Sequence, residues 1–205
     1  MGKILVVGVG PGSGEYLTPA AREAVARAQV LVGGRSALDL FPGDRPSKVI
    51  GKDLEEVLEF IRLHRDTDIA VLTSGDPGFY SILALLTQHF PSEEMEVVPG
   101  ISSLQLCFAR MKEPWHDCRV VSLHGRGIDG LPEELGRAKK LAILTDPKNP
   151  PEAVARLLLQ RGIKGKRAFV CDSLATPQER VVAGDLESIA RERFTGYCVM
   201  VIKDG

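Results

Sequence analysis

The chain has 205 residues, of which 44% are hydrophobic and 26% charged, a balance typical of folded globular proteins. Its formal net charge of −1 offers no basic surface of the kind that nucleic-acid-binding proteins use, so we expect no nucleic-acid partner. The four cysteines, at positions 107, 118, 171 and 198, are widely spaced and form no C-x-x-C pair, which argues against a zinc site and a disulfide scaffold. We therefore expect reduced thiols and no bound metal.

The first elements read as strand, helix and strand. Residues 3–9 form a short apolar run that ends in glycines, which indicates a buried strand. Thr18 and Pro19 suit the N-cap and first position of an alanine-rich helix over residues 20–28. A second apolar run covers residues 30–32. This order predicts an α/β fold with a parallel sheet.

The glycine-rich loop Gly8–Gly14 matches neither common nucleotide motif. The dinucleotide fingerprint G-x-G-x-x-G would require glycine at the position of Ser13. A P-loop would require Gly-Lys-Ser/Thr where the chain has Gly14-Glu15-Tyr16. The loop is therefore expected to contact something other than a pyrophosphate.

The stretch Leu72–Tyr80 follows a third predicted strand and reads Leu-Thr-Ser-Gly-Asp-Pro-Gly-Phe-Tyr. Small residues followed by a carboxylate and a Pro-Gly pair are typical of a ligand-binding strand end. Asp76 has two interpretations: a ligand contact, or the N-cap of a helix that begins near Pro77 and covers residues 81–88.

A second strand end has a similar character. Residues 95–98 read as a strand that ends in Pro99-Gly100-Ile101-Ser102-Ser103, and a helix is expected over residues 104–111. The carboxyl ends of parallel strands meet at one edge of a sheet, where ligands bind. We therefore expect both strand ends to contribute to one site.

A polar segment containing Pro114 separates two patterned regions. It predicts an N-terminal α/β domain over residues 1–112, a linker over 113–117 and a C-terminal α/β domain over 118–205. Trp115 is expected at the domain seam. Further strands are expected at residues 119–123, 141–144, 167–171 and 196–203, with helices at 132–138 and 153–160 and continued β-α alternation.

Gly8-Val9-Gly10-Pro11-Gly12, Ser74-Gly75-Asp76-Pro77, the Pro-Gly-Ile-Ser-Ser strand end and the central linker occur together in this order. Together they resemble the tetrapyrrole (corrin/porphyrin) methylases over the whole chain. The resemblance implies two α/β domains with the active site in the cleft between them, and S-adenosylmethionine as methyl donor. Ser122-Leu123-His124-Gly125-Arg126 is similar to the branch that methylates C5 of cobalt-precorrin-7 or precorrin-6Y in cobalamin biosynthesis.

The resemblance also implies the binding residues. The expected cofactor contacts are Pro11, Ser74, Gly75, Asp76, Phe79, Ser102, Ser103, Thr145 and Leu174. The expected substrate contacts are His124 and Arg126, because the acetate and propionate groups of a tetrapyrrole require cationic or hydrogen-bonding partners. A general base is not identified by the sequence, and His124 is the first candidate because its pKa suits proton transfer near neutral pH.

Other functions remain open at this level. Uroporphyrinogen-III methyltransferases usually have Gly-Gly-Asp-Pro where this chain has Ser74-Gly75-Asp76-Pro77, which favours the C5 branch. Diphthine synthase shares the fold but has a different first loop, and a nucleotide-binding module without catalysis is a third possibility. The resemblance implies a homodimer and allows a separate decarboxylating C15-methyltransferase as partner. No leader or long apolar segment is present, so we expect a cytoplasmic protein without membrane contact.

Overall fold

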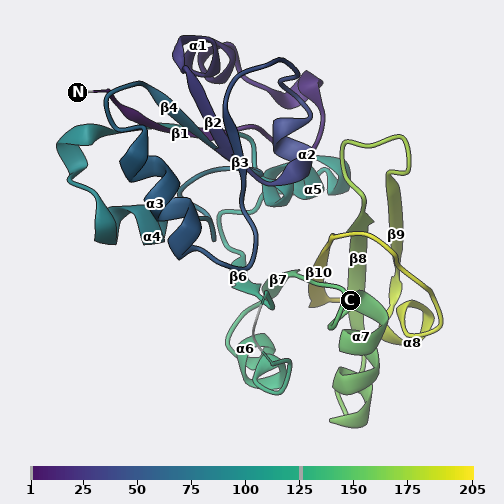
Figure 1. Cartoon of the computed structure of the whole chain (residues 1–205). Helices are drawn as coiled ribbons and strands as arrows, with labels where there is room; N and C mark the ends of the chain where they lie inside the picture. Colours follow the sequence, from purple (N-terminus) through teal and green to yellow (C-terminus); the bar gives the residue numbers. More distant parts are fainter. Residues whose placement is uncertain (1, 125–126) are drawn as a thin grey trace. The chain divides into compact units, whose positions relative to one another are not determined.

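The computed structural model describes residues 2–124 and 127–205, which form two compact units, Met1–Ser102 and Ser103–Gly205 (Figure 1). Each unit has its own five-stranded sheet and its own hydrophobic core. The predicted α/β fold class is confirmed.

The first unit contains a fully parallel sheet with strand order β3-β2-β4-β1-β5. Its elements in chain order are β1 (Ile4–Gly8), the 3-10 turn η1 (Gly14–Tyr16), α1 (Pro19–Arg27), β2 (Val30–Gly33), α2 (Arg35–Leu38), β3 (Ser47–Val49), α3 (Glu55–Leu63), β4 (Ile69–Thr73), α4 (Leu83–His89), η2 (Ser92–Glu94) and β5 (Met95–Val98). The predicted parallel sheet is therefore confirmed for this unit.

Apolar side chains on both faces of the central strands explain this architecture. β1 and β4 are buried along their whole length, as expected for strands covered by helices on both sides. Ala21, Ala24 and Val25 of α1 pack on one face of the sheet. α3 and α4 pack on the opposite face, so the sheet lies between the two helical layers (Figure 1).

The start of α1 follows the prediction, whereas that of α4 does not. The Thr18 hydroxyl accepts a hydrogen bond from the backbone N–H of Ala21, and Pro19 is the first helical residue. Helix α4 begins at Leu83 with Ile82 as its N-cap, six residues after the position expected for a helix capped by Asp76. The N-cap interpretation of Asp76 is therefore wrong, because residues 77–82 form turns that keep this carboxylate away from the helix.

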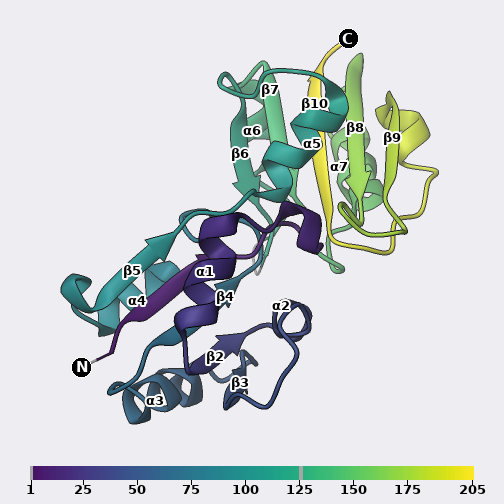
Figure 2. The same ribbon diagram turned by 90° about the horizontal axis from the view of Figure 1, so that it is seen from above.

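The second unit contains a mixed sheet with strand order β6-β7-β10-β8-β9 (Figure 2). Its elements are α5 (Ser103–Met111), β6 (Arg119–Ser122), α6 (Leu131–Gly136), β7 (Lys140–Leu144), α7 (Pro151–Gln160), β8 (Lys166–Asp172), β9 (Arg180–Asp185), α8 (Leu186–Ile189) and β10 (Cys198–Asp204).

The predicted β-α alternation is wrong at the end of the chain. Strands β8 and β9 form an antiparallel pair, and β10 is antiparallel to both β7 and β8. The connection over residues 173–179 is too short for the crossover that parallel strands require. Strand β9 has exposed and partly exposed residues in place of a continuous apolar run, which explains why the sequence did not reveal it.

Helices cover both faces of the second sheet. Leu131 of α6, Leu158 of α7 and Ile189 of α8 pack with one face in a single core cluster. Helix α5 lies on the opposite face, where the Cys107 thiol is 3.9 Å from the carbonyl oxygen of Val199 (Figure 2). Among the described residues, no helix is long and apolar enough to cross a membrane.

The grouping of α5 differs from the predicted domain limits, which placed this helix in the N-terminal domain. The predicted linker, residues 113–117, also belongs to the second unit. The Lys140 ammonium group explains this local packing, because it donates to the carbonyl oxygen of Pro114 at 2.8 Å and to Asp117 Oδ1 at 3.1 Å. Trp115 within this segment is 46% exposed.

Candidate active site

The first sheet has a switch point at the carboxyl ends of β1 and β4. These two strands are neighbours, and Gly8 of β1 pairs with Thr73 of β4. The chain continues from β1 into α1 on one face of the sheet and from β4 into α4 on the other. Diverging connections of this kind leave a crevice outside the strand ends, where α/β proteins bind their ligands.

Three loops meet at this edge through their backbones. A bridge joins Gly10 to Gly75, whose N–H donates to the carbonyl oxygen of Gly10 at 2.8 Å. A Cβ atom on Gly8 would lie 2.6 Å from both the carbonyl oxygen of Gly75 and the amide nitrogen of Gly100. Gly75 also has a φ angle of +72°, a conformation that favours glycine. Glycine is therefore required here for the close approach of the loops that follow β1, β4 and β5.

Asp76 connects two of these loops. Its Oδ2 accepts a hydrogen bond from the N–H of Gly78 at 2.9 Å, and its Oδ1 accepts one from the N–H of Gly100 at 3.2 Å. The side chain is partly exposed, and each carboxylate oxygen has a second lone pair that can accept from a ligand. Asp76 therefore both organises the loops and presents negative charge at the edge of the sheet.

Three other predicted cofactor residues of the first unit belong to the loops after β1 and β4. Pro11 and Phe79 are partly exposed, and Ser74 is exposed. The rings of Phe79 and Tyr80 lie edge to face with centroids 4.9 Å apart. Tyr80 has a φ angle of +51°, a left-handed conformation that costs energy in a non-glycine residue and is frequent in ligand-binding loops.

Ser102 and Ser103 flank the boundary of the two units. Ser102 is 6% exposed and ends the first unit, whereas Ser103 is partly exposed and begins α5 of the second.

Two hydroxyl groups that sequence reasoning missed are candidates for ligand contacts. Among the residues the structure describes, Thr73 Oγ1 and Ser13 Oγ are buried side-chain atoms without a hydrogen-bond partner. Thr73 ends β4, and Ser13 lies within the glycine-rich loop. A hydroxyl residue directly after the apolar run Ile69–Leu72 was the available sequence signal for Thr73. Buried polar groups usually have partners, so both hydroxyls suit contacts with a polar ligand.

The second unit has a comparable edge. Because β10 is antiparallel to β7 and β8, the carboxyl ends of β6, β7 and β8 meet beside the start of β10. His124 follows β6, Thr145 follows β7 and Leu174 follows β8. The structure therefore brings the C-terminal site predictions in the described part of the chain to one edge of this sheet.

Thr145 and Leu174 are both buried at this edge, at 1% and 5% exposure. The Thr145 hydroxyl donates to the carbonyl oxygen of Cys198 at 3.1 Å, so its proton already has an acceptor within the protein. Leu174 lies between Ser173 and Ala175, which have φ angles of +52° and +62°. Positive φ angles in the non-glycine residues on both sides of buried Leu174 indicate a loop whose conformation is tightly determined by its surroundings.

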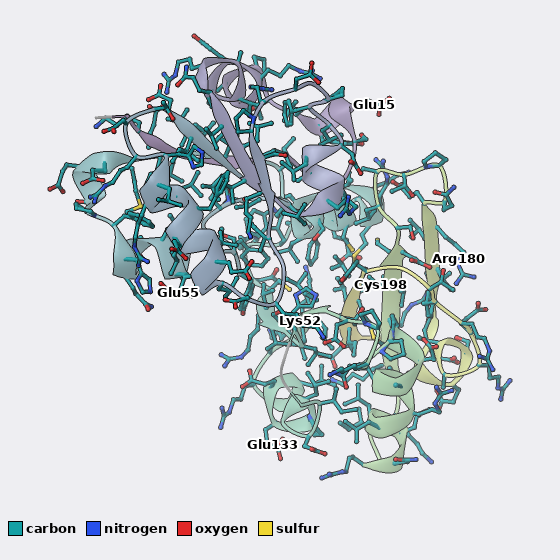
Figure 3. All side chains as sticks on the ribbon, viewed as in Figure 1. Glu15, Lys52, Glu55, Glu133, Arg180 and Cys198 are labelled. Atoms are coloured by element: carbon teal, nitrogen blue, oxygen red, sulfur yellow. The ribbon has the colours of Figure 1, made fainter. Side chains whose placement is uncertain are left out.

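Cys198, labelled in Figure 3, lies close to the buried carboxylate of Asp172. Burial raises the pKa of the Cys198 thiol, and the negative charge of Asp172 raises it further. Cys198 is therefore a neutral thiol near neutral pH and is unsuited to act as a nucleophile. Asp172 Oδ1 accepts a hydrogen bond from the Ser173 hydroxyl at 2.9 Å, which helps to hold the loop after β8.

His124 has an aromatic neighbour that the sequence analysis did not identify. Its ring lies edge to face with Tyr197, at a centroid distance of 5.8 Å, and Tyr197 is 71% exposed. The position of Tyr197 just before β10 was the only sequence signal, and it became informative once β6 and β10 were placed in one sheet. Arg126, the other predicted substrate contact, lies outside the described residues.

The geometry of the first unit fits a ligand with an extended polar part. Its glycines let three loops pack closely together, Asp76 supplies a carboxylate and Thr73 supplies a hydroxyl without a partner among the described residues. S-Adenosylmethionine has hydroxyl and ammonium groups that match these partners. Within the described ranges, no group of three or more histidine, cysteine, aspartate or glutamate side chains could hold a metal ion.

Comparisons with known proteins identify the family of the chain. The model of the family "Tetrapyrrole (Corrin/Porphyrin) Methylases" matches residues 3–190. Cobalt-precorrin-7 C(5)-methyltransferase of Salmonella typhimurium is 39% identical over 182 residues, which cover 87% of this chain and 88% of that protein. Precorrin-6Y C(5,15)-methyltransferase [decarboxylating] of a Sinorhizobium species is 29% identical over 87% of this chain but only 44% of that larger protein.

A solved structure of a related methyltransferase has a similar fold. Uroporphyrin-III C-methyltransferase of Thermus thermophilus, complexed with S-adenosylhomocysteine, is 27% identical, with a TM-score of 0.78 and coverage of 98% of this chain and 97% of that one. The family model thus extends over both units described above, and the fold agrees along nearly the whole chain. The chain belongs to the tetrapyrrole (corrin/porphyrin) methylase family.

Proposed function

We propose that this chain transfers a methyl group from S-adenosylmethionine to C5 of a corrin-pathway tetrapyrrole, cobalt-precorrin-7 or precorrin-6Y, in cobalamin biosynthesis. The methyltransferase class and the methyl donor follow from membership of the family and from the S-adenosylhomocysteine complex of the Thermus protein. The single observation that carries the choice of substrate is the 39% identity to the Salmonella C5-methyltransferase over most of both chains.

The residues at the edge of the first sheet would hold the cofactor, which supplies an electrophilic methyl group on a positively charged sulfur. Pro11, Ser74 and Gly75 would border it with small or rigid groups, and Phe79 would pack against it. The Asp76 carboxylate would accept hydrogen bonds from a cofactor hydroxyl or ammonium group, a contact worth about 1.5–3 kcal/mol. Because the substrate carbon is the nucleophile, the protein contributes mainly by holding and orienting the two ligands.

Ser102, Ser103, Thr145 and Leu174 are further proposed cofactor contacts. Thr145 already donates its hydroxyl proton to Cys198, so we assign its contact to the backbone or to the second lone pair of the hydroxyl oxygen. The backbone of Leu174 is held in a tightly determined loop, which suits a contact through its N–H or carbonyl group.

We assign substrate contacts to His124 and Arg126. His124 can donate a hydrogen bond to a carboxylate arm, and it is also the proposed acceptor of a substrate proton. Tyr197 adds an exposed ring beside it, which can pack against a flat macrocycle. Arg126 would form a charge-assisted pair with an acetate or propionate group.

The test is incubation of the purified chain with cobalt-precorrin-7 and S-adenosylmethionine, followed by mass spectrometry. We expect the tetrapyrrole to gain the mass of one methyl group and the cofactor to become S-adenosylhomocysteine. Parallel reactions with metal-free precorrin-6Y and with uroporphyrinogen III compare the alternative substrates. Methylation of uroporphyrinogen III alone, by an enzyme shown to bind the cofactor, would contradict the C5 assignment.

We also propose a cytoplasmic homodimer that works with a separate decarboxylating C15-methyltransferase. The proposed partner is supported by the Sinorhizobium relative, of which this chain covers 44% and whose name includes both the C5 and C15 positions. Sedimentation of the purified chain tests the dimer, and copurification with a candidate decarboxylating enzyme tests the partner.

A further inference from the structure

Thr73 is a buried residue whose hydroxyl group forms no hydrogen bond with the described residues. Thr73 is the last residue of strand β4 and is 6% exposed. Its Oγ1 atom has no hydrogen-bond partner in the described ranges 2–124 and 127–205. Its backbone carbonyl oxygen, by contrast, accepts a hydrogen bond from the N–H of Val9 at 2.9 Å. A buried hydroxyl without a hydrogen-bond partner destabilises the folded protein, whereas a valine of the same shape would not.

The strand register places this hydroxyl at the cofactor edge. Thr73 pairs with Gly8, so their Cβ directions lie on the same face of the sheet. At Gly8 this direction points at the carbonyl oxygen of Gly75 and the amide nitrogen of Gly100, which belong to the loops that Asp76 connects. The Thr73 side chain therefore projects beside the loops proposed to hold the cofactor.

We propose that Thr73 is a further cofactor-binding residue, whose hydroxyl forms a hydrogen bond with a polar group of S-adenosylmethionine. This inference rests on the proposed function of the same edge and adds a contact from the strand itself to those from the loops. The unpaired hydroxyl weakens the free protein, and binding removes that penalty. Thr73 thus makes the stability of the first unit depend on the cofactor.

The test is Thr73→Val, which removes the hydroxyl and keeps the volume of the side chain. The free protein should melt about 2–4 °C higher, because a buried unpaired group is removed. The dissociation constant for S-adenosylmethionine, measured by calorimetry, should rise about 5–10-fold, as for the loss of one neutral hydrogen bond. The higher melting temperature together with the weaker binding is the expected signature.

Two variants serve as controls. Thr73→Ser keeps the hydroxyl and should bind within about twofold of the wild type. Thr67→Val removes a hydroxyl that is already paired, since Thr67 Oγ1 donates to the carbonyl oxygen of His64 at 2.9 Å, just before β4 begins. It should melt at a lower temperature and bind the cofactor normally.

The outcomes separate this inference from the proposed function. Failure of the wild type to bind S-adenosylmethionine would overturn the proposed function. Normal binding by both the wild type and Thr73→Val would overturn only the role of Thr73. A Thr73→Val protein that melts at a lower temperature than the wild type would show that the hydroxyl is paired within the protein, and this too would overturn the inference.

Discussion

At the scale of single residues, Asp76 organises the loops at the edge of the first sheet, a role that the sequence did not suggest. It is not a helix cap, since its oxygens accept from Gly78 and Gly100 in two different loops. An alanine at this position would leave both N–H groups without their partner, so it would disturb the loops as well as remove the charge. Asp76→Ala therefore cannot test the ligand contact alone, and a more conservative variant is needed.

Asp76→Asn provides that variant, because its amide oxygen can keep one of the two hydrogen bonds. We expect it to lose about 1 kcal/mol of unfolding free energy. We expect its affinity for S-adenosylmethionine to fall about 10–100-fold, because a charge-assisted hydrogen bond is lost. Urea titration and calorimetry measure the two effects separately. Unchanged affinity would show that the carboxylate serves only the loops.

At the scale of elements, helix α5 is tied to the loop after β8 by one ion pair. Arg110 of α5 donates through its guanidinium group to Glu179, and Glu179 Oε2 also accepts from the N–H of Ala175 at 2.8 Å. The hydrogen bond from Arg110 lowers the pKa of Glu179, with the backbone N–H of Ala175 contributing in the same direction and burial opposing it. Glu179 thus holds the strained segment around Leu174.

This arrangement predicts a pH-dependent contribution to stability. Because the folded-state pKa of Glu179 is lowered, its stabilisation is present above the ordinary pKa of glutamate, which is 4.5, and is lost as the pH falls through the lowered value. We expect Glu179→Gln to reduce the free energy of unfolding at pH 7 by about 1 kcal/mol, since the pair is partly exposed.

Denaturation at pH 7 and at pH 3 checks the sign of this effect. The difference between Glu179→Gln and the wild type should become smaller at the lower pH, because the stabilisation from a lowered carboxylate pKa is lost as the pH falls below the ordinary value. Glu187→Gln, an exposed position in the first turn of α8, is a control in the same unit. A difference that stays constant between the two pH values would exclude the ion pair as its cause.

At the scale of the whole molecule, the two units have separate cores. In the described part of the chain, His124, Thr145 and Leu174 lie at one edge of the second sheet, and the loops after β1, β4 and β5 meet at one edge of the first. In the first unit the three glycine-containing loops hydrogen-bond to one another at that edge. These bonds join loops and not strands, so we expect them to open locally and to respond to a bound ligand more than the central strands do.

Hydrogen exchange with and without S-adenosylmethionine should show this pattern. We expect bound cofactor to slow exchange of peptides that cover residues 8–14, 73–80 and 98–102. Peptides over residues 64–68, at the opposite end of β4, should change little. Equal slowing at both ends of the first sheet would indicate general stabilisation and would contradict a site at the carboxyl edge.

The sequence predicted much of the first unit because its signals are local. The short apolar runs of β1 and β4, closed by small residues, favour buried strands, and Thr18 with Pro19 marks the start of a helix. The second unit was harder to predict, since β9 has an exposed pattern and becomes a strand only by pairing with β8. Local propensity cannot reveal a strand whose stability comes from its neighbour.

The sequence by itself determined the α/β class and the motifs around Gly8, Asp76 and Gly100, because those short segments need particular residue types at particular places. The resemblance of these motifs to the tetrapyrrole methylases implied the family and the methyl donor. Only the tertiary structure decided that Asp76 bridges two loops, that Tyr197 lies beside His124 and that the Thr73 hydroxyl has no partner in the described part of the chain. These facts depend on which strands are neighbours and on how the loops that follow those strands contact one another. Sheet order is set by contacts between residues far apart in the chain, and spacing along the sequence does not encode them directly.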